Sequence, residues 1–286
     1  MKYFNAIKSD SKQHQLHKQF LYPIFEHIKK ELTTKDIINF IEKVKFCPIK
    51  NINIIGSDLL NYNEFELLIS HLSSLLVQKH YYLDLSDITK DNIYKVSKIC
   101  NEFSVIVLTL FYNPDITNLI DIINSLKTAN LPIHYRCTVS NETEVLHFKK
   151  IISECQITNY SFIPYYTNNY KFFKENVFLR FDEVLELQND IIKIHSNEYI
   201  NPVFFGKICL MPDNTVKTDI HSTGIIGYND ENFIIQESLY KALTSENNWR
   251  LTRNKVEPCK NCVARFLCTP ISNYEIVLKK FKICEQ

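Results

Sequence analysis

The chain has 286 residues, enough for one medium domain and a smaller second one. Apolar residues make up 45% of it, a share that excludes an intrinsically disordered chain. The formal net charge of +1 excludes bulk electrostatic attraction to nucleic acid or to an anionic membrane surface. With only four glycines and no GxGxxG or GxxxxGKS/T segment, the chain also lacks the phosphate-binding loops of the common nucleotide folds.

The hydropathy pattern contains no membrane span. The longest apolar runs, such as the one from Val105 to Tyr112, are too short to cross a bilayer. The first ten residues are polar and lack the apolar core of a signal peptide, so we predict a cytoplasmic protein. Nine cysteines in a reducing compartment are not a disulfide framework, and clustered ones are therefore candidate metal ligands.

Helical and strand patterns alternate from about Thr33 to Ile163. The pattern predicts helices over 33–44, 63–77, 90–101, 114–129 and 142–154, and strands over 51–55, 81–85, 104–111, 132–139 and 157–163. One strand–helix unit takes roughly 25 residues, which favours parallel strands joined by right-handed crossovers. The expected fold class is α/β, either an open doubly wound sheet or part of a (β/α) barrel.

The pattern changes after Tyr170. Residues 207–211 and 216–218 read as the strands of a hairpin closed by a Pro-Asp-Asn turn, and residues 236–245 read as a helix. Upstream, His17 to Leu32 has apolar residues at helical spacing. We therefore divide the chain into an N-terminal helical segment (1–32), an α/β region (33–195) and a C-terminal region (196–286).

Four cysteines cluster near the C-terminus with the spacing C-x2-C-x5-C-x15-C. They are Cys259, Cys262, Cys268 and Cys284. A C-x2-C pair lets two thiolates reach one centre from a single turn, and two further sulfurs complete the ligand set. The set therefore predicts a metal centre. An all-cysteine site suits both zinc and an iron–sulfur cluster, and the alternative to a metal is a group of buried apolar cysteines.

This spacing resembles the SPASM domain at the C-terminus of radical SAM peptide and protein maturases. By that resemblance, Cys259, Cys262, Cys268 and Cys284 bind one auxiliary [4Fe–4S] cluster. The position that holds a fourth closely spaced cysteine in the family is Ser272, and the upstream hairpin offers only Cys209. The resemblance therefore implies that one cluster is kept and a second is lost, and it favours iron–sulfur over zinc.

Other segments resemble the Bacteroidetes pseudo-radical-SAM proteins, which accompany ribosomally made, modified peptides. The segments are Asn201 to Gly206, Trp249-Arg250, Pro258 to Cys262 and, most specifically, Cys268 to Glu275. The resemblance implies a partial (β/α) barrel of the radical SAM type followed by a small SPASM-like domain. It also implies a precursor peptide or a peptide-modifying enzyme as partner.

The segment Gly56-Ser57-Asp58 resembles the part of radical SAM barrels that meets the methionyl amine of S-adenosylmethionine. The alternative interpretation is an ordinary strand-to-helix turn with Asp58 as a cap. The C-x3-C-x2-C motif that holds the S-adenosylmethionine-binding cluster is absent. The five cysteines outside the C-terminal set, Cys47, Cys100, Cys137, Cys155 and Cys209, do not supply it. We therefore expect no catalytic residues for radical chemistry and no bound S-adenosylmethionine.

Other candidate residues have simpler interpretations. His14 and His17 are spaced as metal ligands without a partner, and His134, Arg136 and His147 read as core or rim residues. The aromatic stretch from Tyr160 to Phe173 predicts core packing or, alternatively, a peptide-binding groove.

The leading hypothesis is a non-catalytic accessory protein that binds a precursor peptide or a partner maturase and contains one [4Fe–4S] cluster. The alternatives are an electron-transferring iron–sulfur enzyme of peptide maturation and a zinc-stabilised protein-binding module.

Overall fold

The computed structural model describes residues 7–8, 32–56, 59–112, 116–129, 131–167, 169–177, 179–187, 190–281 and 284–285. The chain forms two compact units, one of residues Lys45–Asn169 and the other of Met1–Val44 together with Tyr170–Gln286. We name them the sheet unit and the cysteine unit. Of the predicted segment 1–32, the structure describes Ile7, Lys8 and Leu32, and the rest of its predicted helix and the pair His14 and His17 lie outside the described residues. The predicted boundaries after residues 32 and 195 stay predictions.

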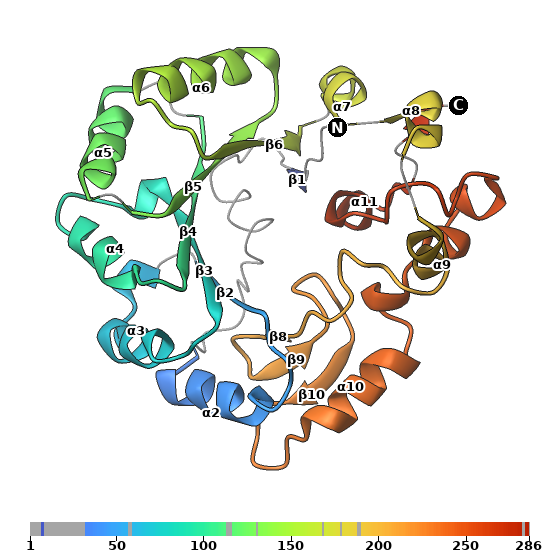
Figure 1. The fold of residues 1–286 in the computed structure, drawn as a ribbon, viewed down its shortest axis with the longest axis horizontal. Coiled ribbons are helices and arrows are strands. Elements are labelled where there is room, and N and C mark those ends of the chain that lie inside the picture. The colour runs from blue at the N-terminus through green and yellow to red at the C-terminus, as the bar shows by residue number, and fades with distance from the viewer. Residues whose placement is uncertain are drawn as a thin grey trace. The chain divides into compact units, whose positions relative to one another are not determined.

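The sheet unit is built on five parallel strands in the spatial order β6-β5-β4-β3-β2 (Figure 1). The strands are β2 (Asn51–Ile55), β3 (Gln78–Asp84), β4 (Ser104–Leu110), β5 (Ile133–Val139) and β6 (Tyr160–Tyr166). Each strand lies beside the one before it in the sequence. This order is the one expected when every crossover has the same hand.

Helices alternate with these strands and cover one face of the sheet (Figure 1). They are η1 (Leu59–Asn61), α3 (Phe65–Ser73), η2 (Leu85–Asp87), α4 (Ile93–Ile99), α5 (Ile116–Thr128) and α6 (Glu142–Glu154). A doubly wound sheet would have helices on both faces, so helices on one face and sequential strand order identify the barrel type. The predicted α/β class is confirmed, and the barrel alternative is the correct one.

The core of the sheet unit lies between the sheet and these helices. Alternate residues of the central strands point into it and are buried, among them Tyr81, Ile106, Leu108, Tyr135 and Cys137. The helices contribute fully buried residues such as Val96, Ile99, Ile123, Phe148 and Ile151. The opposite face carries Asp84, Thr109 and Arg136 together with apolar residues such as Val107 and Ile163. A shift by one residue would move the buried apolar set out of the core, which fixes the register.

Two strands of the sheet unit begin three residues away from their predicted starts. Strand β3 begins at Gln78 rather than Tyr81, because the Lys79 side chain is buried with its Nζ donating to the carbonyl of Leu75 at 2.7 Å. Strand β6 begins at Tyr160 rather than Ile157. The backbone N–H of Ile157 instead donates to Ile152 and closes the end of α6, after Gln156 with φ of 50°.

The cysteine unit combines short elements. Its helices are α2 (Thr34–Val44), α7 (Tyr170–Asn176), α8 (Phe181–Leu185), α9 (Ile191–Tyr199), α10 (Ile235–Thr244), η3 (Asn248–Arg250), η4 (Arg253–Lys255), η5 (Cys259–Asn261) and α11 (Asn273–Leu278). Its strands are β1 (Ile7–Lys8), β7 (Leu179–Arg180), β8 (Cys209–Leu210), β9 (Thr215–Lys217), β10 (Ile225–Tyr228) and β11 (Cys284–Glu285).

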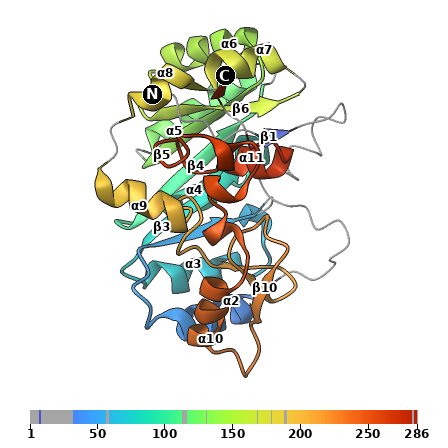
Figure 2. The same cartoon turned by 90° about the vertical axis from the view of Figure 1, so that its right-hand side faces the viewer.

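Strands β8, β9 and β10 form an antiparallel sheet, with α10 packed against β10 (Figure 2). The predicted hairpin is confirmed. Its turn is stabilised by Asp213, whose carboxylate accepts from the Thr215 backbone N–H at 3.0 Å and from its hydroxyl at 2.6 Å. Among the described helices, none is both long and apolar enough to cross a bilayer.

We predict that Phe148→Ala destabilises the sheet unit by about 3–5 kcal/mol, because Phe148 is fully buried and its loss leaves a cavity beneath the sheet. Leu146→Ala, two residues away on α6 and 64% exposed, is the control and should change stability little. Urea denaturation followed by circular dichroism measures both. Equal losses in the two variants would contradict the assigned core.

Candidate metal centre

The C-x2-C pair lies on a single tight turn. Cys259 begins the 3-10 helix η5, and the Cys262 backbone N–H donates to the Cys259 carbonyl at 2.9 Å. A second hydrogen bond closes the turn, from the Lys260 backbone N–H to the Val256 carbonyl at 2.8 Å. Cys259 is buried and Cys262 is half-buried. The spacing therefore places both thiols on one loop, as predicted.

The other two cysteines come from separate segments. The turns after Cys262 end at Cys268, whose backbone N–H donates to Ala264 at 3.0 Å. Cys284 lies on β11, which pairs in parallel with β7 so that Cys284 is beside Leu179. Cys262 packs against the small apolar cluster formed by Val184, Ala264 and Cys268.

A buried ion pair connects these segments. Arg253 Nη1 lies 2.5 Å from Glu275 Oε1, and Nη2 donates to Oε2 at 3.1 Å. The two side chains are 3% and 0% exposed. A bidentate pair of this kind is more stabilising than a single hydrogen bond, because both carboxylate oxygens accept from the guanidinium in one geometry.

The Arg253 guanidinium also donates to groups next to the cysteines. Nε donates to the Thr269 carbonyl at 2.9 Å and Nη1 to the Phe281 carbonyl at 2.8 Å. Nη1 also lies 3.6 Å from the sulfur of Cys259. Sequence reasoning did not identify Arg253, because its partners are distributed over the chain and no local pattern marks it.

Glu275 is fixed in the first turn of α11, where it is the third helical residue. The Ser272 side chain accepts from the Glu275 backbone N–H at 3.4 Å, and Glu275 Oε2 accepts from the Ser272 backbone N–H at 3.0 Å. This reciprocal capping box gives Ser272 a structural role, since its side chain caps α11. The Ser-x-x-Glu pattern was the signal in the sequence that could have located Glu275.

The charges of this ion pair affect the pKa values of the Cys259 and Cys268 thiols. Burial raises the pKa of the Cys259 thiol and that of Cys268, while the Arg253 guanidinium acts in the opposite direction on both. Cys284 is close enough to raise both pKa values slightly further. The thiols must therefore release protons when a metal binds, and Arg253 favours that release.

The cysteines share one neighbourhood without converging on one point. Among the residues that the structure describes, no three His, Cys, Asp or Glu side chains are placed to bind a single metal ion. Cys259 Sγ instead donates to the Phe281 carbonyl at 3.0 Å. Four thiolates on one zinc ion must meet at one atom, whereas those of a cluster bind different irons and lie further apart.

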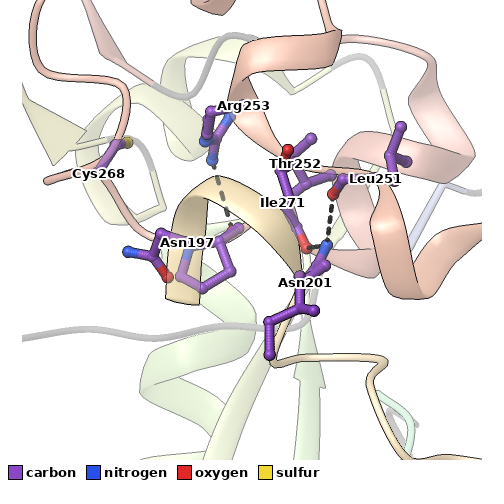
Figure 3. Close-up of a pocket in the computed structure, with 9 residues that line it drawn as sticks. Asn197, Asn201, Leu251, Thr252, Arg253, Cys268 and Ile271 are labelled. Carbon is purple, nitrogen blue, oxygen red and sulfur yellow. Dashed lines mark hydrogen bonds between the residues drawn. The ribbon is translucent and has the colours of Figure 1, made fainter. Parts of the chain in front are cut away.

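A small cavity lies beside the buried arginine (Figure 3). It has a volume of about 10 Å³, enough for one water molecule, and is lined by residues that include Asn197, Arg253 and Cys268. Asn201 supports it by donating to the carbonyls of Leu251 and Ile271 at 3.1 and 2.9 Å. The Oδ1 atom of Asn197 is buried and has no hydrogen-bond partner among the described residues, so the cavity is polar on one side.

The candidate S-adenosylmethionine segment begins at the end of β2. Gly56 directly follows the strand, and a Cβ added there would meet nothing within 4 Å, so packing does not require glycine at this position. Ser57 and Asp58 lie outside the described residues. Their proposed role is therefore neither confirmed nor contradicted.

The remaining cysteines are separated from one another in the fold. Burial raises the pKa of Cys100 to about 11, and the pKa values of Cys137 and Cys209 to about 12, so these are protonated thiols at neutral pH. Cys137 lies on β5, Cys155 directly follows α6, and Cys47 follows α2. They do not form a second ligand set among the described residues.

The predicted rim histidines lie in the sheet unit. His134 Nδ1 is 2.7 Å from Asn159 Oδ1 and its Nε2 is 2.9 Å from Ser161 Oγ, which ties β5 to β6. His147 packs edge-on against Tyr112 at 4.8 Å between ring centroids, and burial lowers its pKa. In the aromatic stretch, Phe172 and Phe173 are buried, and Phe173 stacks on Tyr274 at 4.9 Å.

Comparison with known proteins gives structural neighbours only. No protein-family model matches the chain, and no curated protein matches it by sequence. Streptococcus suis SuiB bound to S-adenosylmethionine matches with a TM-score of 0.61 at 11% identity, over 90% of this chain and 69% of SuiB. SuiB bound to precursor peptide SuiA matches with a TM-score of 0.58 at 12% identity, over 88% of this chain and 67% of SuiB. The chain has a radical-SAM-like fold.

We predict that Glu275→Gln destabilises the cysteine unit by about 3–5 kcal/mol, because it leaves the Arg253 cation buried without its counter-charge. The control is Glu246→Gln. It breaks an exposed pair with Lys255 of similar length, 2.9 Å, and should leave stability nearly unchanged. Urea denaturation monitored by Trp249 fluorescence measures both, since Trp249 is buried in this unit. A loss no greater than that of the control would contradict the role of the pair.

Proposed function

We propose that this chain is a catalytically degenerate, radical-SAM-like accessory protein of a cytoplasmic peptide-modification system. It binds a precursor peptide or its modifying enzyme, and it holds one [4Fe–4S] cluster on Cys259, Cys262, Cys268 and Cys284. The observation that carries the proposal is the contact of Arg253 with Cys259 and, through the carbonyl of Thr269, with the segment of Cys268, in a chain with a radical-SAM-like fold.

The cluster is supported by the kind and the placement of its donors. The four thiols come from three segments of the cysteine unit, with Cys262 and Cys268 in one apolar cluster and Cys259 in another, and an iron–sulfur centre takes four thiolate ligands. When bound, such a cluster supplies electron transfer or structural stabilisation, and a cluster with four cysteine ligands has no open iron. The residues of this chain would position it through the η5 turn, the β7–β11 pairing and the Arg253 hydrogen bonds.

The loss of radical chemistry is supported by the sequence. A reducing cluster with an open iron needs three closely spaced thiolates on the barrel, and the five cysteines outside the C-terminal set are not spaced in that way. We therefore propose that S-adenosylmethionine is not cleaved and that the barrel serves binding.

Peptide binding is supported by the polar face of the sheet. The register places Asp84 beside Thr109 and Thr109 beside Arg136, on the face away from the helices. Thr109 is fully buried, and its hydroxyl has no hydrogen-bond partner among the described residues. Arg136, unlike Asp84 and Thr109, is partly exposed and could contact a peptide. The neighbour SuiB was crystallised with its precursor peptide, which agrees with a peptide as the ligand of this face.

The second candidate is an electron-transferring iron–sulfur enzyme. It is favoured by the surroundings of Cys259, which is buried and hydrogen-bonded. Reversible reduction coupled to turnover of a partner enzyme distinguishes it from the accessory role. A zinc-stabilised binding module would instead be colourless and contain zinc.

Anaerobically purified protein should be brown and contain about four iron and four sulfide ions per chain. Cys259→Ser and Cys268→Ser should lose most of that iron, because each removes one cluster ligand. Cys47→Ser, at a half-buried cysteine outside the set, is the matched control and should retain it. Colourless protein with one zinc ion per chain, or iron retained in all three variants, would contradict the proposed cluster.

A labelled precursor peptide encoded beside this gene should bind the chain, as measured by fluorescence anisotropy. Arg136→Ala should raise Kd about tenfold, or 1.4 kcal/mol, because it removes the cation of the polar face. Lys150→Ala on α6, whose side chain is 66% exposed in a long contact with Glu154, is the control. An unchanged Kd for Arg136→Ala would exclude the polar face as the peptide site.

A further inference from the structure

We infer that strand β2, at the edge of the parallel sheet, binds an extended peptide segment by adding it to the sheet as a further strand. The inference deepens the proposed function, and it rests on that function only for the natural source of the peptide. It concerns the sheet unit alone and requires no bound cluster.

The hydrogen bonds of the neighbouring strand show which backbone groups of β2 are used. In a parallel ladder, the N–H and C=O groups of one residue point to the same side, and successive residues alternate. The Lys79 backbone N–H donates to the Phe103 carbonyl at 2.7 Å, on the side of β4. The residues of β3 that bond β2 are therefore His80 and Tyr82.

The register of β2 against β3 then identifies the outward groups. Asn53 lies in register with His80, and a residue in a parallel pair bonds the two neighbours of its register partner. Ile52 and Ile54 thus bond β3. The residues directed outward are Asn51, Asn53 and Ile55. Their backbone groups make no hydrogen bond to any residue that the structure describes, and the described sheet ends at β2 (Figure 1).

Nothing in the sequence of β2 protects this edge. Edge strands that must not pair with other chains usually carry charged side chains, a proline or a bulge. The strand reads Asn-Ile-Asn-Ile-Ile, and its register with β3 is unbroken. Asn51 and Asn53 are exposed, and Ile55 is 41% exposed. A Cβ added at Gly56, directly after the strand, would meet nothing within 4 Å. The edge is therefore accessible.

The side chains of β2 indicate the chemistry of the added strand. Ile52 and Ile54 lie in register with the buried Lys79 and Tyr81, so they belong to the helix-covered side of the sheet, where they are half-buried. The asparagines lie on the other side. An added strand would place every second side chain beside the isoleucines and the others beside Asn53. The edge therefore fits an uncharged segment in which apolar and polar residues alternate.

A flexible peptide fits this edge better than a second copy of the chain. A stable interface between folded proteins takes about 20–30 residues from each side. A second copy that paired through its own β2 would contribute a strand of five residues. A peptide is not limited to this strand, because it can continue onto the neighbouring polar face.

The probe is a short fluorescein-labelled synthetic peptide of alternating valine and threonine, with a lysine at each end. A second probe has the same sequence with its backbone nitrogens methylated, so that it keeps the side chains but has no N–H donors. The protein variant is Asn53→Pro, which removes an outward donor that the ladder with β3 does not use. Asn53→Ala is the matched control, because it changes the side chain and keeps the backbone groups.

Fluorescence anisotropy should show equal Kd values for wild type and Asn53→Ala. Asn53→Pro, and separately the methylated probe, should raise Kd at least about tenfold, because each removes backbone hydrogen bonds. Amide hydrogen exchange followed by NMR should show an alternating pattern. Bound peptide should slow exchange at Asn51, Asn53 and Ile55, and leave Ile52 and Ile54 unchanged because they already bond β3. The methylated probe and the exchange pattern decide the question if Asn53→Pro does not fold.

Several results would overturn the inference. They are no binding of the probe at up to about 1 mM, equal Kd values for the two probes, and protection that does not alternate along β2. Slow exchange at Asn51, Asn53 and Ile55 before peptide is added would also overturn it, because the chain or a second copy would then already cover the edge.

The proposed function can fail separately. If the encoded precursor peptide does not bind, while the synthetic probe binds with alternating protection, the proposed function is wrong and this inference stands. If the precursor peptide binds and depends on Arg136, while the probe does not bind, this inference alone is wrong.

Discussion

The structure of the cysteine unit depends on the buried ion pair between Arg253 and Glu275. Removing two charges from water costs several kcal/mol for each ion, and only good geometry with further hydrogen bonds offsets that cost. Here the carboxylate caps α11 while the guanidinium bonds the segments beside Cys268 and Cys284. If either charge is lost, the other is left buried and the three cysteine-bearing segments lose a common support.

The sheet unit, in contrast, is stabilised by apolar packing rather than by a buried ion pair. Its helix-covered face is apolar and closely packed, while the other face carries Asp84, Thr109 and Arg136 in adjacent strand positions. The packing that stabilises the sheet lies on its helix-covered side, so the other face can carry polar groups without loss of the fold.

Much of this could be predicted from the sequence, because local patterns determine it. The alternation of apolar strands and amphipathic helices gave the five parallel strands, and the Pro-Asp-Asn turn gave the β8–β9 hairpin. The start of β3 was missed because Lys79 is buried by a backbone bond that no periodicity shows. Arg253 was missed for a related reason. Its partners Glu275 and Phe281 are 22 and 28 positions away, and only the fold brings them together.

Mössbauer spectroscopy of anaerobically purified, iron-57-labelled protein, with and without S-adenosylmethionine, tests the central claim most directly. Because all four irons would be bound by cysteine, the account predicts the signal of one [4Fe–4S] cluster that is unchanged when S-adenosylmethionine is added. A protein without iron, or a cluster in which one iron becomes distinct on adding S-adenosylmethionine, would contradict it.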